Sequence, residues 1–184
     1  MKFLILLLVA SCATLPEVPK PKVKTIADYS AETYPVKGWD ARYSEVIAML
    51  QKQTPIESPC QSVETFLKAI INAESSFNNA SRYMEPAPLS QLSIGLFQLS
   101  LTDNKNHGCT FLSEKDIENP IKNIDCAFKI FVDLKKRLPT QNLWERGGAY
   151  WSVLRDAKWP KWKNKNQSGF IRFKKYAEAN GCPL

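Results

Sequence analysis

Residues 62–77 read Ser-Val-Glu-Thr-Phe-Leu-Lys-Ala-Ile-Ile-Asn-Ala-Glu-Ser-Ser-Phe, and this stretch decides how the chain folds. Its apolar residues recur at helical spacing, which predicts an amphipathic helix. Glu74 lies on the apolar stripe of that helix, in line with Ile70. Burial disfavours the charged form of a carboxyl group, so we expect the raised pKa that a general acid needs near neutral pH. A buried glutamate paired with Arg82 or Arg146 would give the same pattern.

Helical periodicity continues through most of the chain. Further helices are expected after Asp40, after Ser113, from Pro120, over residues 143–155 and after Ser168. Residues 81–101 hold polar turns and leave room for only a short extended segment. The expected fold class is mainly α, with at most a very small β element.

Composition limits the classes of function. The chain has 184 residues, of which 44% are hydrophobic and 23% charged, as expected of one globular domain with its own core. The net charge of +7 favours an anionic partner such as nucleic acid, membrane headgroups or cell-wall polymer. His107 is the single histidine, which excludes a metal site built from several histidines, and no glycine-rich phosphate loop is present. We therefore expect neither a metal nor a cofactor.

The N-terminus predicts export. A short apolar run, too short to span a bilayer, ends in Val-Ala-Ser-Cys at residues 9–12. This resembles the lipobox of bacterial lipoproteins, which implies that residues 1–11 are removed as a signal peptide and that Cys12 is lipidated. Ala13, rather than an aspartate, follows. By resemblance to lipoprotein sorting rules, we expect an outer-membrane lipoprotein facing the periplasm, anchored to the membrane by its lipid. A protein secreted after ordinary signal cleavage is the alternative.

Residues 12–38 differ in composition from the rest of the chain. Prolines and lysines alternate there and long apolar side chains are sparse, which predicts a semi-extended tether behind the lipidated cysteine. The folded domain is then expected over residues 39–184.

Cysteine usage also fits an oxidising compartment. Apart from Cys12 the chain has four cysteines, an even number that suggests two disulfides with three alternative pairings. We expect Cys109 to pair with Cys126, and Cys60 to pair with Cys182 and so tie the C-terminus to the region of Glu74.

Four short motifs follow one another along the chain. They are Ala-Glu-Ser-Ser-Phe-Asn at 73–78, Ser-Ile-Gly-Leu-Phe-Gln at 93–98, Asn-Pro-Ile-Lys-Asn-Ile at 119–124 and Gly-Ala-Tyr at 148–150. Together they resemble the motif regions of the lysozyme-like lytic transglycosylase family, relatives of goose-type lysozyme. The resemblance covers roughly half the chain. It implies a lysozyme-like catalytic domain with a cleft over residues 39–184.

The resemblance also implies a reaction. Glu74 matches the family's single catalytic acid and base, which cleaves the β-1,4 bond between N-acetylmuramic acid and N-acetylglucosamine in peptidoglycan and leaves a 1,6-anhydromuramyl end. Ser75 matches a residue that helps to orient the substrate. Gly95 and Gln98 match the wall of the cleft, and Tyr150 matches a tyrosine close to the glutamate.

Two departures from the family pattern leave the product open. Trp151 stands after Tyr150 where the family usually has asparagine, and the segment over residues 77–95 is longer than expected. A hydrolytic muramidase acting on the same bond would need a second carboxylate, for which Glu85 and Asp103 are candidates. A solvated loop charge is the ordinary interpretation of each. A peptidoglycan-binding outer-membrane lipoprotein without catalysis is a further alternative.

Tryptophans and lysines crowd residues 144–165. Indole rings stack on sugars, but core positions are the better interpretation of Trp144 and Trp151. Such a patch also suits single-stranded nucleic acid, which an exported lipoprotein rarely meets. We therefore expect peptidoglycan strands as partner, no nucleic acid, and a monomer.

Overall fold

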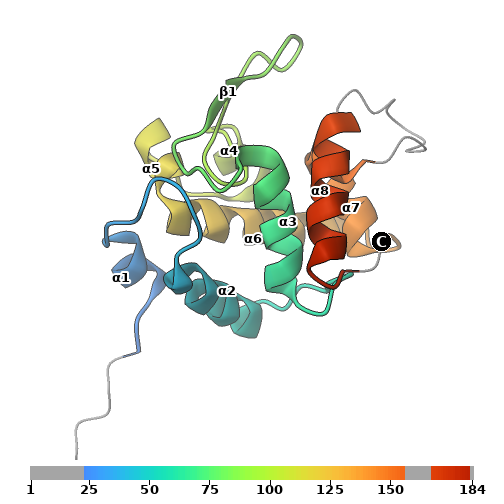
Figure 1. Ribbon diagram of the computed structural model, residues 1–184. Helices are drawn as coiled ribbons and strands as arrows, with labels where there is room; N and C mark the ends of the chain where they lie inside the picture. Colours follow the sequence, from blue (N-terminus) through green and yellow to red (C-terminus); the bar gives the residue numbers. More distant parts are fainter. Residues whose placement is uncertain (1–22, 156–166, 183–184) are drawn as a thin grey trace, which may run out of the picture.

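The computed structural model describes residues 23–155 and 167–182 (Figure 1). Its elements in chain order are α1 (Ile26–Ser30), α2 (Ala41–Gln53), α3 (Val63–Ser75), β1 (Arg82–Met84), β2 (Leu92–Ile94), α4 (Asp103–His107), α5 (Glu114–Glu118), α6 (Pro120–Arg137), α7 (Leu143–Tyr150), the 3-10 helix η1 (Ser152–Leu154) and α8 (Gln167–Ala179). The prediction of a mainly helical fold with one very small sheet is confirmed. None of the helices in these ranges combines the length and the apolar character that a membrane span needs.

Helix α3 holds the core together. It runs beside α8 with α6 behind it (Figure 1). The ring of Phe66 in α3 lies 5.8 Å from that of Phe131 in α6 and 6.2 Å from that of Phe173 in α8, and all three are fully buried. Ser62 caps α3, because its hydroxyl accepts the backbone N–H of Thr65. The apolar stripe seen in the sequence is thus the face that packs into the core.

A buried amide joins two of the sequence motifs. Asn123 of α6 is fully buried, and its Oδ1 accepts the backbone N–H of Phe97 at 2.9 Å. Its Nδ2 donates to the carbonyl oxygens of Ile117, at 2.9 Å, and Ile94, at 3.2 Å. A buried polar group bonded on both sides fixes the backbone around it, because any movement would leave an unpaired group. Asn123 therefore fixes the turn over residues 94–98 against α6.

Strands β1 and β2 form an antiparallel hairpin that projects from the helical body (Figure 1). Tyr83 lies opposite Ser93 and Met84 opposite Leu92. At the base of the hairpin, the guanidinium group of Arg82 forms ion pairs of 2.7 Å with Glu114 and Glu118, which are the first and last residues of α5. The long segment between the first two motifs is thus an ordered arm that is joined to α5.

The ends of several elements agree with the sequence, and two differ. Asp40 and Ser113 cap α2 and α5 as expected, and Pro120 begins the longest helix. Helix α8 begins at Gln167, one residue before the expected cap Ser168.

The helix predicted over residues 143–155 stops at Tyr150. Trp151 has an extended backbone, and its indole Nε1–H donates to the carbonyl oxygen of Phe97 at 3.0 Å. That bond turns the chain away from the helix axis, and the short helix η1 follows. Trp151 is buried and Trp144 packs against the core, as expected.

The folded part begins before residue 39, the predicted boundary. Thr25 and Asp28 form a capping box at the start of α1, and the buried Tyr29 donates its hydroxyl to Glu45 of α2 at 2.6 Å. The composition of this segment did not predict that it is folded, because the single aromatic side chain of Tyr29 suffices to dock the short helix α1.

Residues 36–38 also belong to the fold. The backbone N–H of Gly38 donates to the Phe77 carbonyl at 2.9 Å, and that of Asn79 donates to the Val36 carbonyl at 2.9 Å. For residues 25–38 the structure therefore differs from the predicted tether. The predicted signal peptide, Cys12 and the first part of the predicted tether lie outside the described residues.

Both expected disulfides are present. Cys60, which precedes α3, pairs with Cys182 after α8, and Cys109 pairs with Cys126 of α6. The first bond ties the chain after α8 to the start of α3, so the helix that carries Glu74 is fixed at its N-terminal end.

We predict that Gly95 is the least replaceable glycine of the turn region. Its φ is +83°, and a Cβ atom there would lie 2.5 Å from Nδ2 of Asn123 and 2.7 Å from the carbonyl oxygen of Ile117. Gly95→Ala should lower the free energy of unfolding by about 2–4 kcal/mol, measured by chemical denaturation. Gly108 is the matched control, because it has φ +72° but a Cβ would meet nothing within 4 Å. Gly108→Ala should cost only about 1 kcal/mol, and equal losses would contradict the importance of the Asn123 contact.

Candidate active site

Glu74 lies in the last turn of α3. The helix ends directly after it, because Ser76 and Phe77 adopt left-handed backbone conformations with φ of +51° and +60°. Such conformations are costly for residues with side chains and recur at functional sites. Ala73 and Ser75 on either side are buried, whereas Glu74 itself is half-buried. The carboxyl group of Glu74 therefore lies at the boundary between the core and the surface.

The surroundings of Glu74 favour its protonated form. Burial raises the pKa of this carboxyl group to about 8, and the charge of Glu85 adds to the effect. Arg172 and Arg155 act in the opposite direction and lower the pKa of Glu74. The raised value expected from the apolar stripe is therefore present, and burial is its main cause.

No ion pair accounts for the burial of Glu74. Arg146 instead binds Glu57, with 3.2 Å between its Nη1 and the carboxylate, and Arg82 binds α5. In the described ranges the Glu74 carboxyl group makes no hydrogen bond, whereas every fully buried side-chain nitrogen or oxygen there has a partner. The oxygens of Glu74 must therefore be accessible from outside. The expected alternative, a Glu74 paired with Arg82 or Arg146, is therefore wrong, and the role of Glu74 as a reactive acid stays a prediction.

Two arginines approach Glu74 while bonded elsewhere. Nη2 of Arg172, on α8, donates to the carbonyl oxygen of Ala73 at 2.8 Å, and Nε of Arg155 donates to that of Gly148 at 2.6 Å. Burial lowers the pKa of the Arg155 guanidinium group, and the charge of Glu74 partly offsets this. Their charges would stabilise a carboxylate at Glu74 whenever its proton has left.

Glu85 is the candidate second carboxylate whose charge acts on Glu74. Its Oε1 accepts the hydroxyl of Ser93 at 2.9 Å, and its backbone N–H donates to the carbonyl oxygen of Gln91 at 2.9 Å, which extends the hairpin. Cross-strand partners and alternate residues point to the same face of a hairpin. One face of the hairpin therefore carries the side chains of Tyr83, Glu85 and Ser93. The charge of Glu85 on this face acts on Glu74.

Asp103 does not act on Glu74 directly. It is 2% exposed, and its Oδ2 accepts the hydroxyl of Tyr150 at 2.8 Å. Burial, followed by the charge of Asp103, raises the pKa of the Tyr150 phenol well above its usual range, and the charges of Glu74 and Glu85 add to this. Tyr150 is therefore bonded to Asp103 and lies within reach of the charges of both glutamates. The structure separates the two candidate carboxylates: the charge of Glu85 acts on Glu74, and Asp103 binds the tyrosine.

The motif over residues 93–98 forms a tight turn beside the site. Gly95 and Gln98 both have positive φ, and the backbone N–H of Gly95 donates to the carbonyl oxygen of Ser81 at 2.9 Å. Nε2 of Gln98 donates to the carbonyl oxygens of Gly95, at 2.8 Å, and Ser81, at 3.2 Å. The amide nitrogen of Gln98 therefore stabilises the turn.

Ser75 follows Glu74 directly but its hydroxyl is engaged within the helix. The side chain is buried, and its Oγ donates to the carbonyl oxygen of Ile71 at 3.1 Å. This bond satisfies the hydroxyl inside the last turn of α3. A role of Ser75 in orienting substrate stays a prediction.

Sequence reasoning did not single out Arg155, Arg172 or the bonding of Asn123. The two arginines lie among other basic residues of the C-terminal part, and no spacing indicated that they converge on α3. Asn123 could have been recognised as a polar residue on the apolar side of α6, since Ile121 and Ile124 beside it are also fully buried.

His107 lies beyond Tyr150 and binds Asp133, with 2.7 Å between its Nδ1 and a carboxylate oxygen. Within the described ranges, no three histidine, cysteine, aspartate or glutamate residues lie close enough together to hold a metal ion.

Comparison with known proteins gives structural and family matches. The wild-type form of Bd0314 DslA matches with a TM-score of 0.57 and 18% identity, covering 78% of this chain and 92% of that chain. Two mutant forms of the same protein, each with one glutamate changed to glutamine, match with TM-scores of 0.56, identities of 17% and 18%, and the same coverage. At such identity the likeness concerns the fold alone. The curated proteins give no match.

The family match covers the residues that build the site. Residues 56–170 match the family model of the transglycosylase SLT domain, which is more than half of the chain. This range includes Glu74, Glu85 and Tyr150. The resemblance drawn from the four motifs is confirmed. Together with the acid at the end of α3, this match means that the chain belongs to the transglycosylase SLT domain family.

Proposed function

We propose that this protein is a peptidoglycan lytic transglycosylase that cleaves the β-1,4 bond between N-acetylmuramic acid and N-acetylglucosamine with Glu74 as catalytic acid and base. Family membership supports an enzyme of the lytic transglycosylase type that acts on peptidoglycan. The observation that carries the finer proposal is the carboxyl group of Glu74, which has a pKa of about 8, accessible oxygens and no ion pair with the described residues.

One carboxyl group suffices for the reaction without water. Glu74 gives its proton to the glycosidic oxygen as the bond from that oxygen to C1 of the muramyl residue breaks, and the second sugar leaves as an alcohol. The Glu74 carboxylate then takes the proton of the muramyl C6 hydroxyl. The C6 oxygen bonds to C1 and closes the 1,6-anhydro ring, so Glu74 is protonated again. Between the two transfers, Arg155 and Arg172 favour the carboxylate form.

The residues around Glu74 form the surface that binds the substrate. The turn that contains Gly95 and Gln98 forms the wall next to the acid and is held by Asn123. Tyr150 approaches the acid from α7. Ser75 supports the helix end that carries Glu74.

Glu85 favours a second candidate, a hydrolytic muramidase on the same bond. A second carboxylate near the acid could activate a water molecule or stabilise the glycosyl cation. Its charge already acts on Glu74. The glutamates changed in the two Bd0314 DslA mutants lie eleven positions apart, as Glu74 and Glu85 do.

We also propose that the protein is anchored to the outer membrane through a lipid on Cys12 and faces the periplasm. The lipobox-like sequence at residues 9–12 and Ala13 support this. The disulfides Cys60–Cys182 and Cys109–Cys126 suit an oxidising compartment.

The role of Glu74 gives the first prediction. Glu74→Gln should lower the rate of peptidoglycan cleavage at least about 100-fold, because an amide has no proton of suitable acidity to transfer. In the wild type, the rate should fall as pH rises through about 8, where the carboxyl group loses its proton. Zymography and turbidity assays of cell-wall suspensions over a pH range measure both effects.

The matched control is Glu64→Gln, the same change on the surface of the same helix. Glu64 accepts a hydrogen bond from Ser44 and pairs with Lys68, remote from the site, so this variant should keep its activity. Equal clearing by the wild type and Glu74→Gln would exclude the catalytic proposal. A wild type that binds cell walls but clears none would identify the peptidoglycan-binding lipoprotein instead.

The product is the subject of the next prediction. Mass spectrometry of the released muropeptides should find 1,6-anhydromuramyl ends, both with the wild type and with Glu85→Gln. The pH at which the Glu85→Gln rate falls should be lower, since the charge that helps to raise the pKa of Glu74 is gone. Reducing ends made by the wild type and lost in Glu85→Gln would establish the muramidase.

Anchoring can be tested on the full-length protein in a bacterial host. The wild type should take up a labelled fatty acid and sediment with outer membranes, whereas Cys12→Ser should do neither. An unlabelled wild type in the culture medium would show secretion instead.

A further inference from the structure

We propose that residues 35–39, the stretch just before α2, form a positioning strap that holds the turn after α3 and thereby fixes the place of Glu74. The inference rests on the proposed role of Glu74 as the catalytic acid. The strap precedes residue 56, so it lies outside the part of the chain that matches the family model. It therefore adds to the residues that the family match accounts for.

The turn after α3 depends on support from other parts of the chain. Helix α3 ends at Ser75, and Ser76 and Phe77 both have left-handed backbone conformations, with φ of +51° and +60°. Such conformations are costly for residues with side chains and persist only where the surroundings enforce them. Glu74 lies in the last turn of the helix, where fraying begins unless the end is held. Contacts that hold Phe77 in place therefore also restrain the helix end that carries Glu74.

The strap runs antiparallel to the residues that follow the helix and bonds to their backbone. The N–H of Gly38 donates to the carbonyl oxygen of Phe77 at 2.9 Å, and the N–H of Asn79 donates to that of Val36 at 2.9 Å. Asn79 is buried, and its Nδ2 donates to the carbonyl oxygen of Pro35 at 3.1 Å. Backbone and side-chain hydrogen bonds thus join the strap to the turn.

The ring of Phe77 is held as well. Trp39 of the strap contacts it edge-on, with 6.1 Å between ring centroids, and Tyr176 of α8 contacts it at 5.8 Å. Trp39 is itself anchored to α2, because its indole Nε1–H donates to the hydroxyl of Ser44 at 3.1 Å and its ring lies 5.3 Å from that of Tyr43. Phe77 is therefore fixed by its carbonyl group and by its ring, and the strap supplies a contact to each.

The strap is joined to the rest of the domain at both ends. Before it, the hydroxyl of Tyr34 donates to the carbonyl oxygen of Tyr29 at 2.8 Å. Nδ2 of Asn119, the cap of α6, donates to the carbonyl oxygen of Ser30 at 2.8 Å. After the strap, Asp40 caps α2. The strap thus cannot move away from the turn without breaking contacts to α2 and α6, so it can act as a restraint.

The restraint matters because general acid catalysis depends on geometry. Glu74 must lie within hydrogen-bond reach of the glycosidic oxygen, and a misplacement of about 1 Å can cost about 100-fold in rate. The strap exerts its effect through the end of α3 and without touching the substrate. A loosened strap should therefore lower kcat and leave KM nearly unchanged.

The variant Gly38→Ala loosens the strap through its backbone alone. Gly38 has φ +108°, which a residue with a Cβ atom rarely adopts, and a Cβ there would meet nothing within 4 Å. Amide hydrogen exchange, measured by NMR on the intact protein, reports the effect and needs no catalytic turnover. The exchange rates of the backbone N–H groups of Ser76 and Asn79 should rise at least about 10-fold more than that of Ile70 in the middle of α3.

The activity of the same variant is measured with soluble glycan strands as substrate. Gly38→Ala should lower kcat about 10-fold and change KM by less than about twofold. Gly108→Ala is the matched control, because Gly108 also has a positive φ and open space for a Cβ but lies at the end of α4. It should leave kcat, KM and the exchange at Ser76 unchanged.

A second variant keeps the test decisive if Gly38→Ala does not fold. Asn79→Ala removes the side-chain bond to Pro35 and leaves the backbone bonds of the strap in place. It should raise the exchange at Ser76 and lower kcat in the same direction as Gly38→Ala, with smaller effects.

Three results would overturn the inference. The first is wild-type exchange at Ser76 in both Gly38→Ala and Asn79→Ala. The second is a rise in exchange that is as large at Ile70 as at Ser76, which would make the strap merely structural. The third is faster exchange at Ser76 with an unchanged kcat, in a protein whose cleavage depends on Glu74.

The exchange measurement separates this inference from the proposed function. If Glu74→Gln cleaves peptidoglycan as the wild type does, the proposed reaction fails. The exchange at Ser76 in Gly38→Ala then still decides whether the strap holds the end of α3.

Discussion

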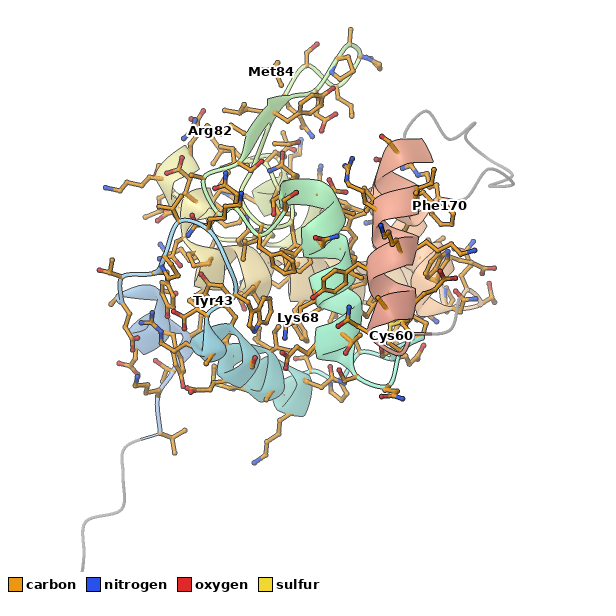
Figure 2. The ribbon with its side chains drawn as sticks, in the orientation of Figure 1. Tyr43, Cys60, Lys68, Arg82, Met84 and Phe170 are labelled. Atoms are coloured by element: carbon orange, nitrogen blue, oxygen red, sulfur yellow. A yellow bond between two sulfur atoms is a disulfide. The ribbon has the colours of Figure 1, made fainter. Side chains whose placement is uncertain are left out.

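The structure of the site depends on one constraint: a carboxyl group is held at the edge of the core, and no cation of the described residues is bonded to it. The ring of Phe66 packs α3 against α6 and α8. Cys60, which precedes α3, lies beside the end of α8, where its disulfide bond to Cys182 holds the start of the helix (Figure 2). The pKa of Glu74 is raised because burial destabilises the charged carboxylate relative to the neutral carboxylic acid.

Three separate parts of the chain set the balance of charge at Glu74. The hairpin brings a like charge in Glu85, while α8 and the segment after η1 bring Arg172 and Arg155. The like charge favours the proton and the arginines favour its release, so the acid is not locked in either state. A group that must both give and take a proton requires such a balance. Tyr150, bonded to Asp103 rather than to the acid, completes the surroundings.

The two departures from the family pattern contribute to the fold around the site. Trp151 stands where the family usually has asparagine, and its indole is buried and bonded to the carbonyl oxygen of Phe97. That bond holds the peptide group after Phe97, and the amide of Asn123, which accepts the N–H of Phe97, holds the peptide group before it. The longer segment before Gly95 forms the hairpin whose face carries Glu85. The turn over residues 94–98 is thus held by Asn123 of α6 and by Trp151, the residue that follows α7.

The sequence by itself determined most of the helices, the caps at Asp40 and Ser113, the start of the longest helix at Pro120, and the position of Glu74 on the apolar stripe, because helical period and capping are local properties of the chain. It did not determine where the folded part begins, since the docking of Tyr29 against Glu45 depends on a residue from another helix. Nor could it choose between Glu85 and Asp103, because both lie outside the four motifs. Only the tertiary structure decided that the charge of Glu85 acts on Glu74 and that Asp103 binds Tyr150, because the folding of the hairpin and of α7 brings together groups that are far apart in the sequence.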